Sequence, residues 1–318
     1  MNKLTKFIKI KKLVKKIFFL IPIYIFIKNI LIKNLFFKFI ANNKTIIFEN
    51  NNNNFELLAK NGDEMYIINS SDKFISKELF INGEAEFDKF LKVLEIIGNK
   101  ITKKTLIDIG ANIGNVCIPA IKRGIFKNCL AIEPDPYNYS LLKKNIYIND
   151  INEKIETLNL AIGSVDNKRL DFSLDNINFG DHRVIDKNII YKKNKYLENK
   201  RSIITVDSKK LDTVIKNFNH KETLIWIDVQ GYEAFVLDGA NNILSAKPFL
   251  VIEFWPYALD RNNSYELLKK TIIKTNYENC YDLSSNVNYG KISEEKFDIL
   301  YLEYKSEKRE EVSDLLFF

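Results

Sequence analysis

The feature that most constrains this 318-residue chain is a series of short apolar segments that alternate with helical patterns. Short apolar runs, which favour buried strands, occur at 105–109, 129–132, 155–160, 224–228 and 249–253. Helices are expected at 86–97, from 115 to about 123, from 136, from about 233, and at 265–275. Strands that alternate with helices predict a doubly wound α/β fold, with a mostly parallel sheet covered on both faces.

Two regions flank this series. Residues 55–81 alternate short apolar stretches with turn residues, which predicts a few short strands before the main domain. Near the C-terminus, 297–303 and 314–318 both read as strands and suggest an antiparallel closing pair. The expected organisation is therefore a basic N-terminal segment (1–45), a β-rich extension (46–100) and a Rossmann-like main domain (101–318). Ligands of such a domain gather at the carboxyl ends of the strands.

The formal net charge of +7 comes from the N-terminal segment. Residues 1–45 hold eleven lysines and no acid, so +7 less eleven leaves −4 for the rest of the chain. A mildly acidic body argues against a nucleic-acid partner. Cys117, Cys129 and Cys280 are scattered, with neither a disulfide framework nor metal-ligand spacing, so no metal is expected.

The N-terminal segment has an amphipathic pattern. Phe7, Ile10, Val14 and Ile17 share one helical face, with lysines on the other. The apolar run 17–27 would rise only about 16 Å as a helix, too short for a hydrocarbon core of about 30 Å. We expect a cytoplasmic protein in peripheral contact with the inner face of an anionic membrane. The alternatives are packing on the fold or on a partner subunit and, third, a spanning helix.

The segment from Asp108 to Gly114 follows the first strand of the main domain and carries the donor-site pattern. Gly110 permits a tight turn, Gly114 allows a close approach, and the next helix presents free N–H groups. A dinucleotide site prefers G-x-G-x-x-G, but Asn112 and Asn115 stand where two of its glycines would be. Asp108 also suits a cationic ligand. S-adenosylmethionine, which carries a sulfonium, an ammonium and one carboxylate, is the expected cofactor.

Two further residues extend this predicted donor site. Glu133 ends the second strand, 19 residues after Gly114, where an acid accepts hydrogen bonds from ribose hydroxyls. Ala161 follows the third strand, where such folds lay the adenine against the backbone. The glycine loop, the acid and the alternating frame together are far more specific than any one of them.

The segments Thr105–Gly114 and 131–136 resemble the first two motifs of FkbM-type methyltransferases. The segment 227–233, which reads I-D-V-Q-G-Y-E, resembles that family's third block, and 180–183 (G-D-H-R) and 248–253 fit as well. The resemblance covers roughly residues 70–255. It implies transfer of a methyl group, usually to an oxygen of a carbohydrate, a natural product or a related small molecule.

Transfer to a hydroxyl needs in-line placement and a base that takes the proton. Asp228, at the end of the fourth strand, is the first candidate for that base, followed by Glu233 and His182; Asp228 could instead cap a helix or hold the donor. Arg183 and Glu253 are candidates for acceptor contact. The competing hypotheses are an NAD-dependent oxidoreductase and a non-catalytic binding module. The acceptor and the oligomeric state are left open by the sequence.

Overall fold

The computed structural model describes residues 40–41, 43–49, 54–185, 200–216, 219–306 and 312–318. The chain divides into two compact units, Met1–Asn51 and Asn52–Phe318. In the first unit the described residues 40–41 and 43–49 are helical, and most of the predicted amphipathic segment lies outside the described residues. Within the described residues, no helix combines the length and apolar character that a membrane span requires.

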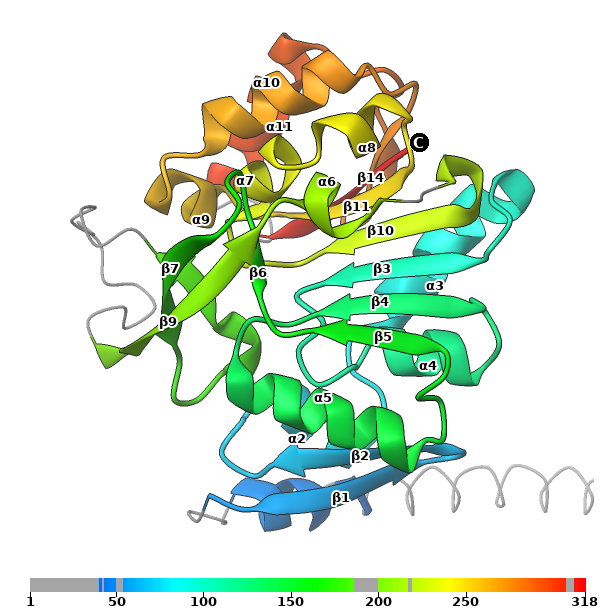
Figure 1. The fold of residues 1–318 in the computed structure, drawn as a ribbon, viewed down its shortest axis with the longest axis vertical. Coiled ribbons are helices and arrows are strands. Elements are labelled where there is room, and N and C mark those ends of the chain that lie inside the picture. Colours follow the sequence, from blue (N-terminus) through cyan, green and yellow to red (C-terminus); the bar gives the residue numbers. More distant parts are fainter. Residues whose placement is uncertain (1–39, 42, 50–53, 186–199, 217–218, 307–311) are drawn as a thin grey trace, which may run out of the picture. The chain divides into compact units, whose positions relative to one another are not determined.

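The second unit is built on a mixed, mostly parallel sheet (Figure 1). Its spatial order is β13-β12-β14-β11-β10-β3-β4-β5. The parallel strands are β3 (Thr105–Ile109), β4 (Asn128–Ile132), β5 (Ile155–Leu158), β10 (Thr223–Ile227) and β11 (Phe249–Phe254). Antiparallel strands β12 (Cys280–Asp282), β13 (Val287–Asn288) and β14 (Ser313–Phe317) complete it. Asp108 lies level with Trp226 and Ala131, so the carboxyl ends of three strands reach one edge.

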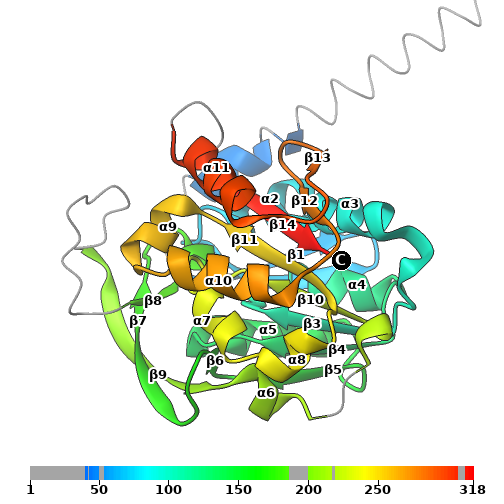
Figure 2. The ribbon, with the colours of Figure 1, turned by 90° about the horizontal axis from the view of Figure 1, so that it is seen from above.

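Helices cover both faces of this sheet, with α3 on one face and α7, α8 and α10 on the other (Figure 2). The predicted doubly wound fold is therefore confirmed. The helices are α3 (Phe87–Ile97), α4 (Cys117–Lys122), α5 (Pro136–Ile148), α6 (Leu211–Val214), α7 (Glu233–Asp238), α8 (Asn241–Ser245), α9 (Pro256–Arg261), α10 (Tyr265–Thr275) and α11 (Glu294–Lys305). Apolar side chains of β3, β10, β11 and β14 and of α7, α8, α10 and α11 form a buried core between sheet and helices.

A hairpin of β1 (Glu56–Asn61) and β2 (Glu64–Asn69) forms the predicted N-terminal extension. Its free edge is held by α5, because the side-chain oxygens of Asn145 and Asn149 accept hydrogen bonds from the N–H groups of Ile67 and Met65 (2.6 and 3.0 Å). The same two amides donate to the carbonyls of those β2 residues. Two buried asparagines thus replace a neighbouring strand and satisfy the backbone of β2.

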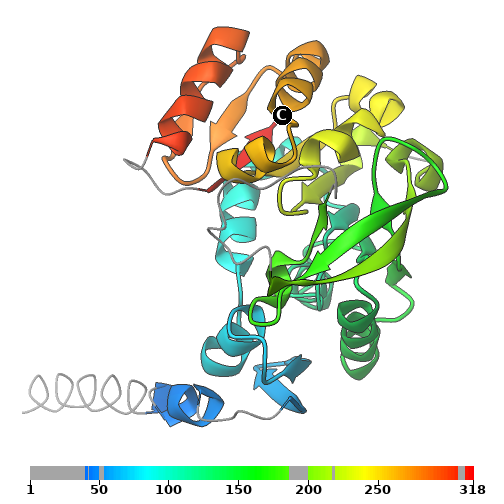
Figure 3. The same cartoon turned by 90° about the vertical axis from the view of Figure 1, so that its left-hand side faces the viewer.

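A second sheet, which the sequence reasoning did not predict, has the order β6-β9-β7-β8 (Figure 3). Its strands are β6 (Ala161–Ile162), β7 (Lys168–Leu174), β8 (Arg183–Ile185) and β9 (Ser202–Lys209). Ala161, Leu170, Phe172, Val184 and Val206 form its small apolar core. The connection between β7 and β8 includes a short 3-10 turn, Phe179–Asp181, and lies next to the candidate site.

Two predictions of secondary structure were wrong. Residues 297–303, expected as a strand, lie in helix α11. The hydroxyl of Ser293 caps this helix by accepting a hydrogen bond from the N–H of Lys296. Phe297, Leu300 and Tyr304 are buried at helical spacing. Part of 55–81, expected as strands, forms helix α2 (Ile75–Asn82). The carboxylate of Asp72 starts α2 by accepting hydrogen bonds from the backbone N–H groups of Phe74 and Ser76.

Candidate active site

The carboxyl ends of β3, β4 and β10 open into one cavity, which the second sheet also borders. The structure brings eight of the twelve predicted site residues to its lining. These are Asp108, Gly110, Asn112, Asn115, Glu133, Ala161, His182 and Asp228. Gly114, Arg183, Glu233 and Glu253 are not among the lining residues. The local geometry of each predicted residue explains whether it lines the cavity.

The loop after β3 depends on glycine at two positions. Gly110 has φ +89°, and a Cβ there would lie 1.8 Å from the carbonyl oxygen of Asp228. The loop can therefore approach β10 only without a side chain at Gly110. Gly114 has φ +94°, and a Cβ there would collide with Ile118 at 2.5 Å. Gly114 therefore allows the close packing of α4, and it does not line the cavity.

Asp108 lies at the floor of the cavity and is 2% exposed. Burial raises the pKa of Asp108 to about 7, against hydrogen bonds from Cys117 that favour the ionised form. Its Oδ2 atom has no hydrogen-bond partner among the described residues. A buried carboxylate oxygen without a donor is costly, so this position suits a ligand that brings an N–H group or a positive charge.

Glu133, at the end of β4, is held by the backbone on both of its oxygens. Oε2 accepts from the N–H of Asn112 and Oε1 from the N–H of Asp135, both at 2.8 Å. Burial and the nearby carboxylate of Asp135 raise the pKa of Glu133 to about 8. Each oxygen keeps a lone pair for a further donor. The carboxylate is thus fixed in place, with room for hydroxyl groups.

Asp228 follows β10 and forms a bridged pair with Glu253 of β11. The side-chain Nε2 of Gln230 donates to Asp228 Oδ1 (2.6 Å) and to Glu253 Oε1 (3.2 Å). Burial and the charge of Glu86 raise the pKa of Asp228 well above its usual range. Burial and the charge of Asp228 do the same for the pKa of Glu253. Asp228 and Gln230 line the cavity, whereas Glu253 does not.

Glu233 and Arg183 have partners that direct them away from the cavity. Glu233 Oε1 accepts from the N–H groups of Val229 and Gly231, both at 3.1 Å, and so closes the turn between β10 and α7. The guanidinium of Arg183 is fully buried and pairs with Asp181 (3.0 Å). Glu233 thus supports the turn after β10, Arg183 pairs with the side chain of Asp181, and neither residue lines the cavity.

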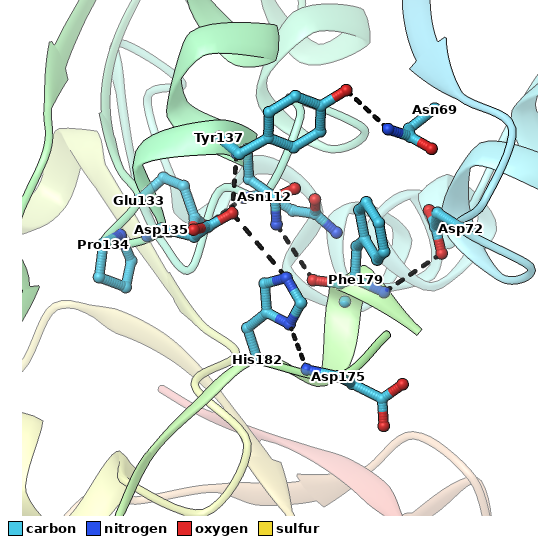
Figure 4. A network of polar contacts seen from close by, with 12 residues as sticks. Asn69, Asp72, Asn112, Glu133, Pro134, Asp135, Tyr137, Asp175, Phe179 and His182 are labelled. Atoms are coloured by element: carbon cyan, nitrogen blue, oxygen red, sulfur yellow. Dashed lines mark hydrogen bonds and ion pairs between the residues drawn. The ribbon is translucent and has the colours of Figure 1, made fainter. Parts of the chain in front are cut away.

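His182 lies in the buried wall formed by the second sheet (Figure 4). Its Nδ1 accepts from the N–H of Asp175 (3.0 Å), and its Nε2 lies 3.8 Å from a carboxylate oxygen of Asp135. Burial and the charge of Arg201 lower the pKa of His182 to about 4. The imidazole is therefore neutral at neutral pH and a weak proton acceptor, which disfavours it as the base.

The lining residues that the sequence reasoning missed include Glu86, Asn138, Phe179, Gln230 and Tyr232. Glu86 precedes α3 with φ +60°, and the Nδ2 of Asn115 lies 3.5 Å from its carboxylate. Gln230 lies in the segment 227–233, which the sequence analysis had already singled out, so it could have been predicted as a site residue. Tyr232 lies in the same segment, whereas the other three come from segments that carry no local sign of a site.

S-adenosylmethionine fits these residues. Its ammonium would give Asp108 Oδ2 the missing partner, and its ribose hydroxyls suit the fixed carboxylate of Glu133. The sequence profile of the methyltransferase FkbM domain matches residues 108–277, more than half of the chain. The chain belongs to the FkbM methyltransferase family. The predicted resemblance is confirmed, and membership in the FkbM family implies use of S-adenosylmethionine.

Solved structures similar to this FkbM chain include the FkbM methyltransferase of Methylobacillus flagellatus KT, at 18% identity and TM-score 0.41. The alignment covers 68% of this chain and 44% of that one, so the chain spans less than half of that relative's length. Methanocaldococcus jannaschii TYW2 in complex with AdoMet aligns at 11% identity and TM-score 0.36, over 84% of this chain and 86% of that one. No curated protein sequence matches the chain.

Proposed function

We propose that this chain transfers the methyl group of S-adenosylmethionine to a hydroxyl of a neutral sugar, a glycan or a related small molecule. One observation carries the proposal. Four carboxylic acids line the cavity, namely Glu86, Asp108, Glu133 and Asp228, and no lysine or arginine lines it within the described residues. An acceptor that carries phosphate or carboxylate would find no counter-ion there, whereas carboxylates bind hydroxyl groups well.

The proposed roles follow from the positions of these acids. Glu133 binds the ribose, Asp108 the ammonium, and Asp228 takes the proton of the acceptor hydroxyl. When bound, S-adenosylmethionine supplies an electrophilic methyl group and leaves as the neutral thioether. A cation in the cavity favours the ionised form of Asp228 and offsets the rise in its pKa caused by burial. Gln230 keeps the carboxylate of Asp228 oriented through its bond to Oδ1.

Calorimetric titration tests the donor, and formation of S-adenosylhomocysteine tests the acceptor. We expect S-adenosylhomocysteine to bind and NAD not to bind, because Asp108 faces the ligand where a pyrophosphate would need N–H groups. Among matched hydroxyl acceptors, neutral sugars should be methylated in preference to sugar phosphates or uronic acids. Binding of NAD alone, or preference for the anionic acceptors, would contradict the proposal.

We also propose that residues 1–45 hold the protein at an anionic membrane surface through charge and modest apolar burial. Each lysine near such a surface contributes about 1 kcal/mol, within a screening length. Binding to vesicles that contain anionic lipid should therefore weaken sharply from low to high salt and disappear when residues 1–45 are removed. Full-length protein that only detergent releases from membranes would instead indicate a spanning segment.

A further inference from the structure

The second sheet contributes side chains to the same cavity as the donor loop. Phe172 of β7 and Val184 of β8 line it, as do Asn178, Phe179, Gly180 and His182 from the connection between these strands. The apolar residues Ile132, Pro134 and Leu160, which end or follow β4 and β5 of the main sheet, also line the cavity. The cavity therefore has an inner apolar wall from the main sheet and an outer one from the second sheet.

The contacts of the connection place it on the Glu133 side of the cavity. The Nδ2 of Asn138 donates to the carbonyl of Phe179 (3.0 Å), and a Cβ at Gly180 would lie 3.4 Å from the Nδ2 of Asn112. Asn112 is the residue whose N–H donates to Glu133. No hydrogen bond or ion pair recorded between described residues joins the connection to Asp228 or Gln230. The outer wall thus covers the ribose end.

Polar contacts also hold the connection in a defined shape. The carboxylate of Asp175 accepts from the N–H groups of Ile177 and Asn178 (2.7 and 2.8 Å) and pairs with Arg201 (2.7 Å). The N–H of Lys73 donates to the carbonyl of Ile177 (2.8 Å), and Asp72 accepts from the N–H of Phe179 (3.3 Å). The connection is therefore anchored both within itself and to the segment before α2.

His182 joins this connection to the turn that carries Glu133 (Figure 4). Because its Nδ1 accepts a backbone N–H from Asp175, a neutral imidazole carries its proton on Nε2. That atom lies 3.8 Å from Asp135 Oδ2, and the N–H of Asp135 donates to Glu133. The ring of His182 also stacks on Phe179, with centroids 5.4 Å apart. His182 therefore holds the connection through the Asp175 N–H and lies next to Asp135, in the turn that supports Glu133.

We infer that Phe172, Val184 and the connection Asp175–His182 form the outer wall of the compartment that holds the adenosyl group, and that His182 is the positioning residue of this wall. The inference rests on the proposed function, since it assumes ribose at Glu133. An adenine attached to that ribose would lie between two apolar walls, which suits its flat, uncharged faces. The wall then slows escape of the donor and leaves the Asp228 end open to the acceptor.

The test measures affinity and dissociation rate of S-adenosylhomocysteine and of adenosine. His182→Leu removes the acceptor of the Asp175 N–H, and Val184→Ala removes apolar contact with the base. Each should weaken both ligands by about tenfold, mainly through faster dissociation. His182→Asn retains an acceptor for the Asp175 N–H and should recover most of the loss. If His182 had only a structural role, His182→Leu would lower the melting temperature, and His182→Asn would not restore the affinity for the two ligands.

Ile203→Ala is the matched control, because Ile203 lies on β9 of the second sheet, is 47% exposed and does not line the cavity. It should leave both affinities unchanged. If His182→Leu does not fold, the two ligand affinities of Val184→Ala test the inference alone. The inference is overturned if the folded variants of the outer wall bind both ligands with unchanged affinity. It is also overturned if they lose affinity for S-adenosylhomocysteine but not for adenosine. Failure of the unaltered protein to bind S-adenosylhomocysteine would overturn the proposed function instead.

Discussion

Replacement of Glu133 by alanine is expected to weaken binding of S-adenosylhomocysteine by at least about a hundredfold. Two hydrogen bonds from ribose hydroxyls to a carboxylate contribute about 1.5–3 kcal/mol each, and about 1.4 kcal/mol corresponds to a factor of ten. Stability should also fall, because the N–H groups of Asn112 and Asp135 lose their acceptor. Calorimetry well below the melting temperature of the variant separates the two effects, and Glu156→Ala, at an exposed position of β5, is the matched control.

The pH dependence of binding offers a second readout of the same carboxylate. Glu133 has a pKa of about 8 without ligand, and only its ionised form accepts from both hydroxyls. Binding therefore lowers this pKa and releases a proton, so affinity should rise as pH increases from 6 to 8, by up to about tenfold per unit. Asp108, with a pKa of about 7, acts in the same direction. Glu133→Gln should reduce the dependence to the part that Asp108 contributes, and an affinity that falls over this range would refute the assignment.

Replacement of Asp228 by asparagine is expected to lower turnover by at least about a hundredfold, the usual loss when a general base is removed. The amide retains the shape of the carboxylate but cannot take the proton of the acceptor hydroxyl. Binding of S-adenosylhomocysteine should persist. Turnover is measured as S-adenosylhomocysteine formed with any hydroxyl acceptor that the unaltered protein methylates.

Glu233→Gln provides the comparison that separates the two candidate bases. The carboxylate of Glu233 accepts two backbone N–H groups in the turn after β10, so its loss should reduce stability more than turnover per folded molecule. If Asp228→Asn instead abolishes donor binding, Asp228 is a donor-site residue and the base lies elsewhere. If Glu233→Gln has the larger effect on turnover at equal folding, the assignments of the two residues are reversed.

The sequence by itself determined the parallel part of the fold and eight of the residues that line the cavity. Buried strands and the glycine turn are encoded by residues that are neighbours in the chain: Gly110 directly follows β3, and Glu133 directly follows β4. The interval 265–275 was predicted as a helix with the bounds that α10 has. These features depend on local periodicity and on turns that few residues permit, so a single sequence reveals them.

Only the tertiary structure decided which polar side chains reach the cavity. Glu86 precedes α3, and Phe179 belongs to an unpredicted sheet, yet both line the cavity beside the donor loop. Conversely, Glu233 stands in a motif but turns back to its own loop. The alternation in 297–303 suited a strand, whereas burial of Phe297 and Leu300 against the core selected a helix. The physical reason is common to all of them: a side chain's partners are set by contacts between segments distant in the chain, and local pattern does not encode those contacts.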